Sequence, residues 1–251
     1  MKRLLLVLTL LLWPSAIWAA APVVQTRATS RQTSSVTTAQ VVTLPASIAS
    51  GDLIIVCVTG GATGTFTWPG SWVEIADRDE VTGEQENMTV GYLAASGGET
   101  TVTVTSSANM RTTHVSMRIS GAEVPGTQAP EIAITSGTAT DDPDPPNLTP
   151  TGGSKDYLWI ACAGSANGAA YSPNYPGSYV SGQEIESGGT TSSHTLAGSA
   201  ERTLTAASEN PGTFVHSDAG TRDWVAATIA IHPSSGAPPA TTGPGWWGNV
   251  W

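Results

Sequence analysis

Two stretches of this chain, about a hundred residues apart, repeat the same pattern, and this self-similarity constrains the fold more than any single residue does. Residues 51–57 (GDLIIVC) are followed by residues 69–72 (PGSW), and residues 155–162 (KDYLWIAC) are followed by residues 176–179 (PGSY). Each apolar run lies between turn residues, which is the pattern of a strand buried on both faces. Such a repeat predicts two pseudo-repeated halves, at about residues 22–125 and 126–235.

Strand patterns recur along the chain, whereas helix patterns after residue 21 are interrupted by Gly, Pro, Ser or Thr. Alternating or one-faced apolar residues predict strands at 73–77, 101–105, 113–119, 131–135 and 224–231. Many short strands separated by turn residues are typical of an antiparallel β-sandwich or barrel, so we expect an all-β fold. The residues predicted to form the core are Leu53, Ile55, Val56, Leu158, Ile160, Val225 and Ile229.

The first 21 residues have the features of a signal peptide. Lys2 and Arg3 precede an apolar stretch that is too short to span a bilayer, and small residues at 19–21 resemble a cleavage site. We therefore expect a secreted, extracellular or cell-surface protein with no transmembrane segment after cleavage.

The acidic balance of the chain disfavours nucleic acid as a partner. Removal of Lys2 and Arg3 with the signal takes two of the ten basic residues and none of the twenty acidic ones, which leaves a net charge of −12. Such a surface repels phosphate backbones, and the arginines are scattered along the sequence rather than clustered.

Composition divides the mature chain into a β-sandwich at 22–235 and a Gly/Pro/Trp-rich C-terminal tail at 236–251. Residues 138–147, which contain the proline-rich run at 141–146, are the natural connector between the halves, because three prolines exclude a central strand. Exposed indoles are unfavourable in water unless they dock, so we expect Trp246, Trp247 and Trp251 to dock on a partner, with self-docking and disorder as alternatives.

The order of these motifs resembles jelly-roll-like modules of structural tail and fibre-type proteins of tailed phages and of related secreted bacterial surface proteins. The motifs concerned are residues 44–56, 69–72, 145–161 and 224–231, and the resemblance spans about residues 24–233. It implies a jelly-roll-like β-sandwich with a structural or surface-binding role. Phage tail proteins are not usually exported, so the signal peptide favours a cell-surface or secreted bacterial protein.

Cys57 and Cys162 occupy corresponding places in the two repeated strands. Because the expected compartment is oxidising, they are candidates for a disulfide. The alternative is two small buried apolar side chains, a common use of free cysteine, since duplication alone would place a cysteine at both positions.

The aromatic residues Trp68, Trp72, Tyr175 and Tyr179 follow the Gly-rich loops at matching positions in the two halves. Flat aromatic faces stack on sugars and anchor protein interfaces, so these four residues are the candidates for ligand binding. A Trp beside a Pro-Gly turn also caps the open end of a sandwich as part of the core, and this alternative stays open.

No pattern in the sequence indicates a catalytic or metal site. The four histidines show no zinc-site spacing, and the Gly-x-Ser-x-Gly motif of many hydrolases is absent, although a Ser-His-Asp triad has no fixed sequence order. We interpret His114 and His232 as exposed side chains, and we expect no enzyme activity, cofactor or metal. The sequence thus predicts a structural or adhesive subunit that self-assembles or binds another surface or virion protein, with a carbohydrate-binding module as the alternative.

Overall fold

The computed structural model describes residues 20–80, 85–138, 142–166, 170–188, 194–218, 220 and 222–235. The predicted tail with Trp246, Trp247 and Trp251 lies outside the described residues, as do Asp141 and the predicted signal peptide up to residue 19. In the part of the chain that is described, every regular element is a β-strand, and all strand pairs are antiparallel. The predicted all-β class is confirmed.

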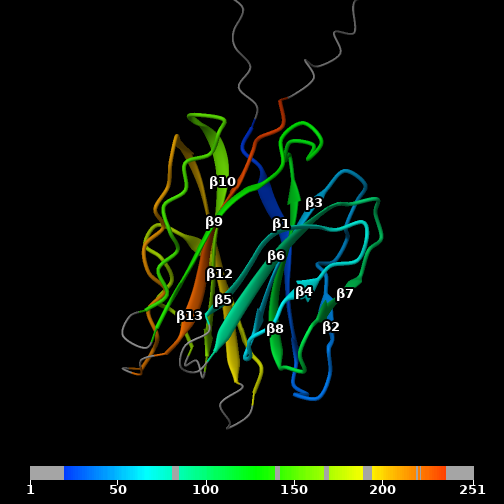
Figure 1. Cartoon of the computed structure of the whole chain (residues 1–251). Coiled ribbons are helices and arrows are strands. Elements are labelled where there is room, and N and C mark those ends of the chain that lie inside the picture. The colour runs from blue at the N-terminus through cyan, green and yellow to red at the C-terminus, as the bar shows by residue number, and fades with distance from the viewer. Residues whose placement is uncertain are drawn as a thin grey trace, which may run out of the picture.

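Two five-stranded sheets form the body of the molecule (Figure 1). The first has the order β1 (Val23–Gln32), β8 (Thr112–Ser120), β3 (Leu53–Gly60), β6 (Glu86–Ala94) and β5 (Val73–Glu80). The second has the order β11 (Val180–Glu186), β12 (Thr195–Ala206), β10 (Lys155–Ala166), β13 (Trp224–Ile231) and β9 (Glu131–Gly137). A small third sheet has the order β2 (Ala39–Thr43), β7 (Thr101–Ser106) and β4 (Phe66–Thr67), and it lies at the right of Figure 1.

The two large sheets are arranged alike. The order β1-β8-β3-β6-β5 in the first half corresponds to β9-β13-β10-β12-β11 in the second half, because both orders read 1-5-2-4-3 when only the strands of each large sheet are numbered along the chain. This correspondence is compatible with the predicted pseudo-repeat and with a jelly-roll-like sandwich. The five predicted strands are also present, as parts of β5, β7, β8, β9 and β13.

The main core lies between the two large sheets. Leu53 and Ile55 of β3 meet Leu158 and Ile160 of β10 there, and all seven predicted core residues are buried. Val56 points to the opposite face of β3 and packs beneath the small third sheet. Because β3 is covered on both faces, its sequence is continuously apolar, as the repeat predicts.

The outer face of the second large sheet is covered by loops rather than by a third sheet. Tyr157 and Trp159 of β10 pack there against Tyr171, Tyr179 and Phe214, which come from the loops on either side of β11 and β12. The same burial on both faces therefore accounts for the apolar run of β10.

A disulfide joins Cys57 of β3 to Cys162 of β10 and links the two large sheets through the main core. Both sulfur atoms belong to fully buried residues. The repeated position of the two cysteines thus places them opposite each other, because β3 and β10 are the corresponding central strands of facing sheets.

Candidate functional site

The four loop aromatics are largely packed. Trp68 stacks on Trp72, with ring centroids 5.2 Å apart, and both indoles are 9% exposed. A side-chain carbon at Gly91 of β6 would lie 2.8 Å from the Trp68 ring, so the absence of a side chain at Gly91 makes room for this indole. The Trp68 Nε1 group donates to Thr89 Oγ1 at 2.9 Å. These contacts leave little aromatic face for stacking on a sugar.

The tyrosines of the second half are held in a similar way. Tyr175 lies over Gly182 of β11, where a side-chain carbon would come within 2.2 Å of its ring. Tyr179 is 8% exposed, and its hydroxyl lies 3.4 Å from Glu209 Oε1. In both halves, therefore, the aromatic residues after the Gly-rich loops cover the outer face of a large sheet.

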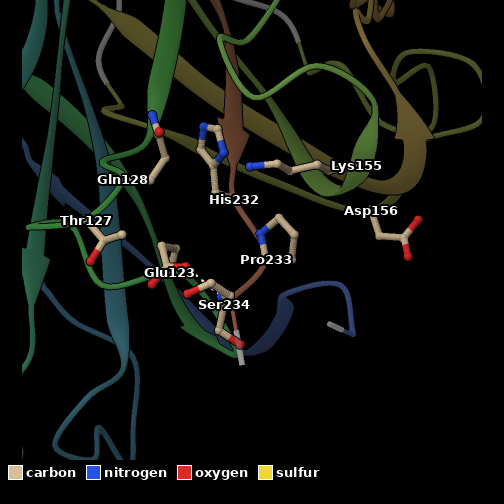
Figure 2. A pocket seen from close by; sticks show the side chains of 9 residues that line it. Glu123, Thr127, Gln128, Lys155, Asp156, His232, Pro233 and Ser234 are labelled. Atoms are coloured by element: carbon tan, nitrogen blue, oxygen red, sulfur yellow. Dashed lines mark hydrogen bonds between the residues drawn. The ribbon is translucent and has the colours of Figure 1, made fainter. Parts of the chain in front are cut away.

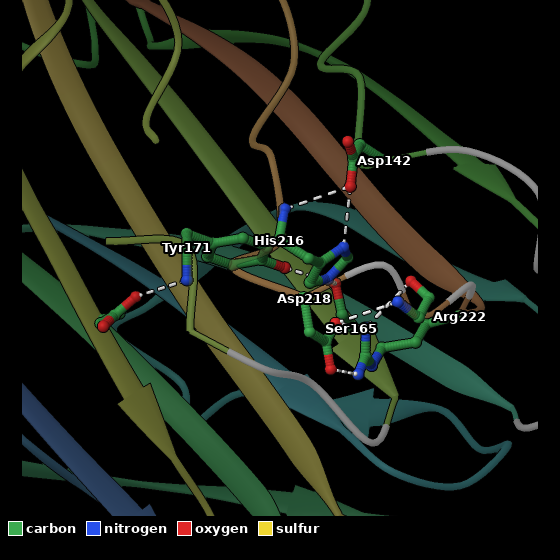
Figure 3. A network of polar contacts seen from close by, with 8 residues as sticks. Asp142, Ser165, Tyr171, His216, Asp218 and Arg222 are labelled. Carbon is green, nitrogen blue, oxygen red and sulfur yellow. Dashed lines mark hydrogen bonds and ion pairs between the residues drawn. The ribbon is translucent and has the colours of Figure 1, made fainter. Parts of the chain in front are cut away.

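A Ser-His-Asp arrangement, which the sequence did not reveal, lies at one end of β10 (Figure 3). The hydroxyl of Ser165 lies 3.0 Å from His216 Nε2, and His216 Nδ1 lies 2.9 Å from Asp142 Oδ1. Asp142 also accepts the backbone N–H of His216 at 3.1 Å. Because the carboxylate accepts from Nδ1–H, Nε2 is left to accept the Ser165 proton, which is the proton arrangement of a serine hydrolase.

The network is enclosed among the residues that the structure describes. Ser165 and Tyr171 are 0% exposed, and the Tyr171 hydroxyl hydrogen-bonds to Ser165 Oγ. Burial lowers the pKa of His216, and the hydrogen bond with Asp142 opposes this shift. The ring is therefore neutral at pH 7. Since the polar side-chain atoms of Ser165 and His216 all have partners within the protein, the network joins the connector and the loop after β12 to strand β10.

A second buried polar cluster lies between the sheets. Glu86 of β6 is fully buried, and burial raises its pKa well above the usual range. The Thr195 hydroxyl of β12 donates to Glu86 Oε1. Thr59 Oγ1 of β3 lies 3.1 Å from Thr195 Oγ1 and 2.6 Å from Thr113 Oγ1. The cluster therefore hydrogen-bonds the two large sheets to each other across the polar end of their interface.

Asp77 and Glu184, two acidic residues of polar segments, each hold a loop in place by accepting backbone hydrogen bonds. Asp77 accepts the backbone N–H of Phe66 at 3.1 Å, and Glu184 accepts those of Tyr171 and Ser172 at 2.8 and 3.0 Å. Within the described ranges, no group of three His, Cys, Asp or Glu side chains is arranged to hold a metal ion.

The prediction that His114 and His232 are exposed is wrong, because both are buried. His114 of β8 lies beneath the small third sheet, where its nitrogens are 2.9 Å from Ser30 Oγ and 2.7 Å from Thr112 Oγ1. Alternation along a strand marks a solvent-facing side only where one face of the sheet is open, and β8 is covered on both faces.

A pocket of about 360 Å³ lies at the opposite end of β10 from Ser165 (Figure 2). It is formed by the loop after β8, the first residues of β10 and the residues that follow β13. Figure 2 shows the end of the Lys155 side chain directed at the His232 ring. Its lining comprises Glu123, Thr127, Gln128, Lys155, Asp156, His232, Pro233, Ser234 and Ser235.

A larger groove, of about 790 Å³, lies beside the small third sheet. We call it the β7 groove and define it by Pro69, Trp72, Val73, Thr103 and Pro125, which belong to its lining. The groove exists because β4 pairs with β7 only at Phe66 and Thr67 before the chain turns away at the Pro69–Trp72 hydrogen bond.

No family model, curated protein or solved structure matches this chain. Among the residues that the structure describes, no helix has the length and apolar character needed to cross a bilayer. The interpretation of the site therefore depends on its own geometry.

Proposed function

We propose that this chain is a secreted, non-enzymatic structural or adhesive protein, acting as a subunit or surface module of an extracellular or virion assembly. The observation that carries the proposal is a contrast between enclosed and open sites. The hydrolase-like trio of Ser165, His216 and Asp142 is closed by Tyr171. The β7 groove, in contrast, is open, and its lining offers a peptide the side chains of Pro69 and Trp72 and the strand edge at Thr103.

The backbone of β7 supports this role because one of its edges is incompletely paired in the described structure. Ser106 donates its N–H to Thr38 on the β2 side, and Ser107 donates to Thr65 on the β4 side. Since N–H groups alternate sides along a strand, that of Thr103 points toward the groove, beyond the end of β4. An unpaired edge of this kind accepts an added strand from another chain.

The partner segment we assign to the β7 groove is residues 236–251 of a second copy. This segment contains Trp246, Trp247 and Trp251 and no charged side chain, which suits a groove lined by Trp72 and Pro69. It follows Ser235, whose N–H donates to Glu123 at 2.6 Å, close in sequence to the groove residue Pro125. At about 3.3 Å per extended residue, it reaches roughly 50 Å, enough to cross to a neighbouring copy.

Sedimentation velocity of residues 22–251 and of two variants tests the groove. Thr103→Pro removes the N–H that points into the groove, and proline is tolerated on a strand edge. We expect this variant to stay monomeric at concentrations where the parent chain associates, whereas Gly126→Ala, at a groove residue with open space around it, should associate normally. Association of Thr103→Pro equal to that of the parent would exclude the β7 edge as the contact.

Hydrolysis of p-nitrophenyl acetate tests the non-enzymatic part of the proposal. Because Ser165 is enclosed, the parent chain and Ser165→Ala should give the same low rate. A parent rate more than about tenfold above that of Ser165→Ala, with unchanged folding, would show that Ser165 acts as a nucleophile and would overturn this part.

A further inference from the structure

The pocket beside Lys155 contains a donor and an acceptor that have no hydrogen-bond partner among the residues that the structure describes. We propose that it binds a neutral, hydroxyl-rich ligand about the size of one sugar ring. This inference goes beyond the proposed function, because the pocket would bind such a ligand whether or not the chain assembles through its β7 groove.

His232 supplies the acceptor. Its Nε2 lies 2.8 Å from Glu131 Oε1, and Glu131 also accepts the backbone N–H and the hydroxyl of Thr151. Although burial alone would raise the pKa of Glu131, these hydrogen bonds lower it, so the carboxylate is ionised. Burial lowers the pKa of His232, so its ring is neutral at pH 7 and carries its proton on Nε2.

The other ring nitrogen of His232 therefore has a lone pair that faces no protein donor. His232 is 2% exposed, and within the described residues Nδ1 has no hydrogen-bond partner. The ring is fixed in place by an edge contact with Tyr157, with centroids 5.0 Å apart. A buried acceptor of this kind is unfavourable unless a bound molecule donates to it.

Lys155 supplies the donor. Within the described part of the chain its ammonium group makes no hydrogen bond and no ion pair within 4.0 Å, although its charge lowers the pKa of Glu123, and Figure 2 shows it directed at the His232 ring. A ligand hydroxyl that reaches both groups would accept from the ammonium and donate to Nδ1. This bridging geometry is available to an alcohol or a sugar and is not available to a carboxylate, which has no proton to donate.

The charges around the pocket favour a neutral ligand. Glu123, Asp156 and Glu131 outnumber Lys155 and disfavour an anion, while the Lys155 ammonium disfavours a cation at the His232 ring itself. The hydroxyls of Thr127 and Ser234 and the amide of Gln128 add further hydrogen-bonding groups to the lining. A volume of about 360 Å³ is near the lower limit for small-molecule sites, which suits one sugar ring.

The sequence provides a sharp probe of this site. Lys155 is the single lysine after the signal peptide, so lysine labelled with ¹⁵N at Nζ reports on this pocket alone in residues 22–251. Histidine labelled with ¹³C at Cε1 reports on His232, whose signal is assigned with His232→Gln. The probes are the methyl α-glycosides of glucose, galactose and mannose, with sodium acetate and tetramethylammonium chloride as the charged controls.

We expect at least one glycoside to shift both the Lys155 and the His232 signals saturably, with an affinity of roughly 1 mM for so small a ligand. Lys155→Met, read from His232, should weaken binding about tenfold or more, whereas Asp144→Asn, at an exposed residue outside the pocket lining, should bind as the parent does. Absence of a saturable shift with all three glycosides would mean that the pocket holds only water and would overturn the proposal. Stronger binding of acetate than of any glycoside would overturn it as well. Neither result would affect association through the β7 groove.

Discussion

Loss of the Cys57–Cys162 disulfide should destabilise the protein strongly, because the bond joins the central strands of the two large sheets. The cross-link closes a loop of 105 residues. In the chain-entropy model a loop of this length lowers the entropy of the unfolded chain and so raises its free energy by about 4.7 kcal/mol. Reduction leaves both side chains in place, so the effect of the bond can be measured without changing the composition of the core.

The assay is guanidinium unfolding of residues 22–251 at equilibrium, with and without a reductant, and of Cys57→Ala/Cys162→Ala. We expect reduction to lower the free energy of unfolding by about 3–5 kcal/mol, and the double variant to lose slightly more, since it also removes two sulfur atoms from the core. Val90→Ala, in the same core, controls for loss of core volume without loss of a cross-link. A loss below about 1 kcal/mol on reduction, with an unchanged denaturant slope, would refute the claim that the bond constrains the unfolded chain.

Four further predictions concern the two halves and their buried groups. Ile55→Ala should cost about 2–5 kcal/mol in denaturant unfolding, and a loss well under 1 kcal/mol would show that Ile55 is not a core residue. Residues 22–125 alone should give no cooperative melt, because their sheet would expose the face that β10 and β13 cover; a sharp melt with dispersed amide signals would indicate two independent domains. Gly91→Ala should cost about 1–3 kcal/mol by displacing Trp68, whereas Gly70→Ala, which has open space around it, should cost much less. Burial lowers the pKa of His114 to about 3, so below pH 6.5 the unfolded chain binds a proton at this residue that the folded chain does not bind. The free energy of unfolding of the wild type should therefore fall relative to that of His114→Gln by about 1.4 kcal/mol per pH unit from pH 6 to 4. Parallel pH profiles of the two proteins would contradict this.

The sequence contains most of the information on the central strands. The apolar runs of β3 and β10 predict burial on both faces, and this burial occurs because a sheet covers one face of each strand and a small sheet or loops cover the other. The positions of Cys57 and Cys162 follow from the same repeat.

The polar interior was not predictable from local patterns. Ser165, His216 and Asp142 come from a strand, a loop and the connector, so only the packing of those elements brings them together. Likewise, alternation along β8 gave the wrong environment for His114, because the covering third sheet is formed by distant residues. One signal of the ligand pocket was present, a single lysine in an acidic mature chain, but its proximity to His232 depends on the antiparallel pairing of β10 with β13.

Removal of the C-terminal tail tests the proposed assembly most directly. Sedimentation velocity and thermal melting should be compared for residues 22–251 and for the chain truncated at Gly236. We predict that the full mature chain associates as its concentration rises, and that the truncated chain stays monomeric with a nearly unchanged melting temperature. The contradicting result would be a full chain that is monomeric at every concentration together with a truncated chain that melts at a much lower temperature. That result would show that the tail packs on the core of the same chain, and it would contradict assembly through the β7 groove.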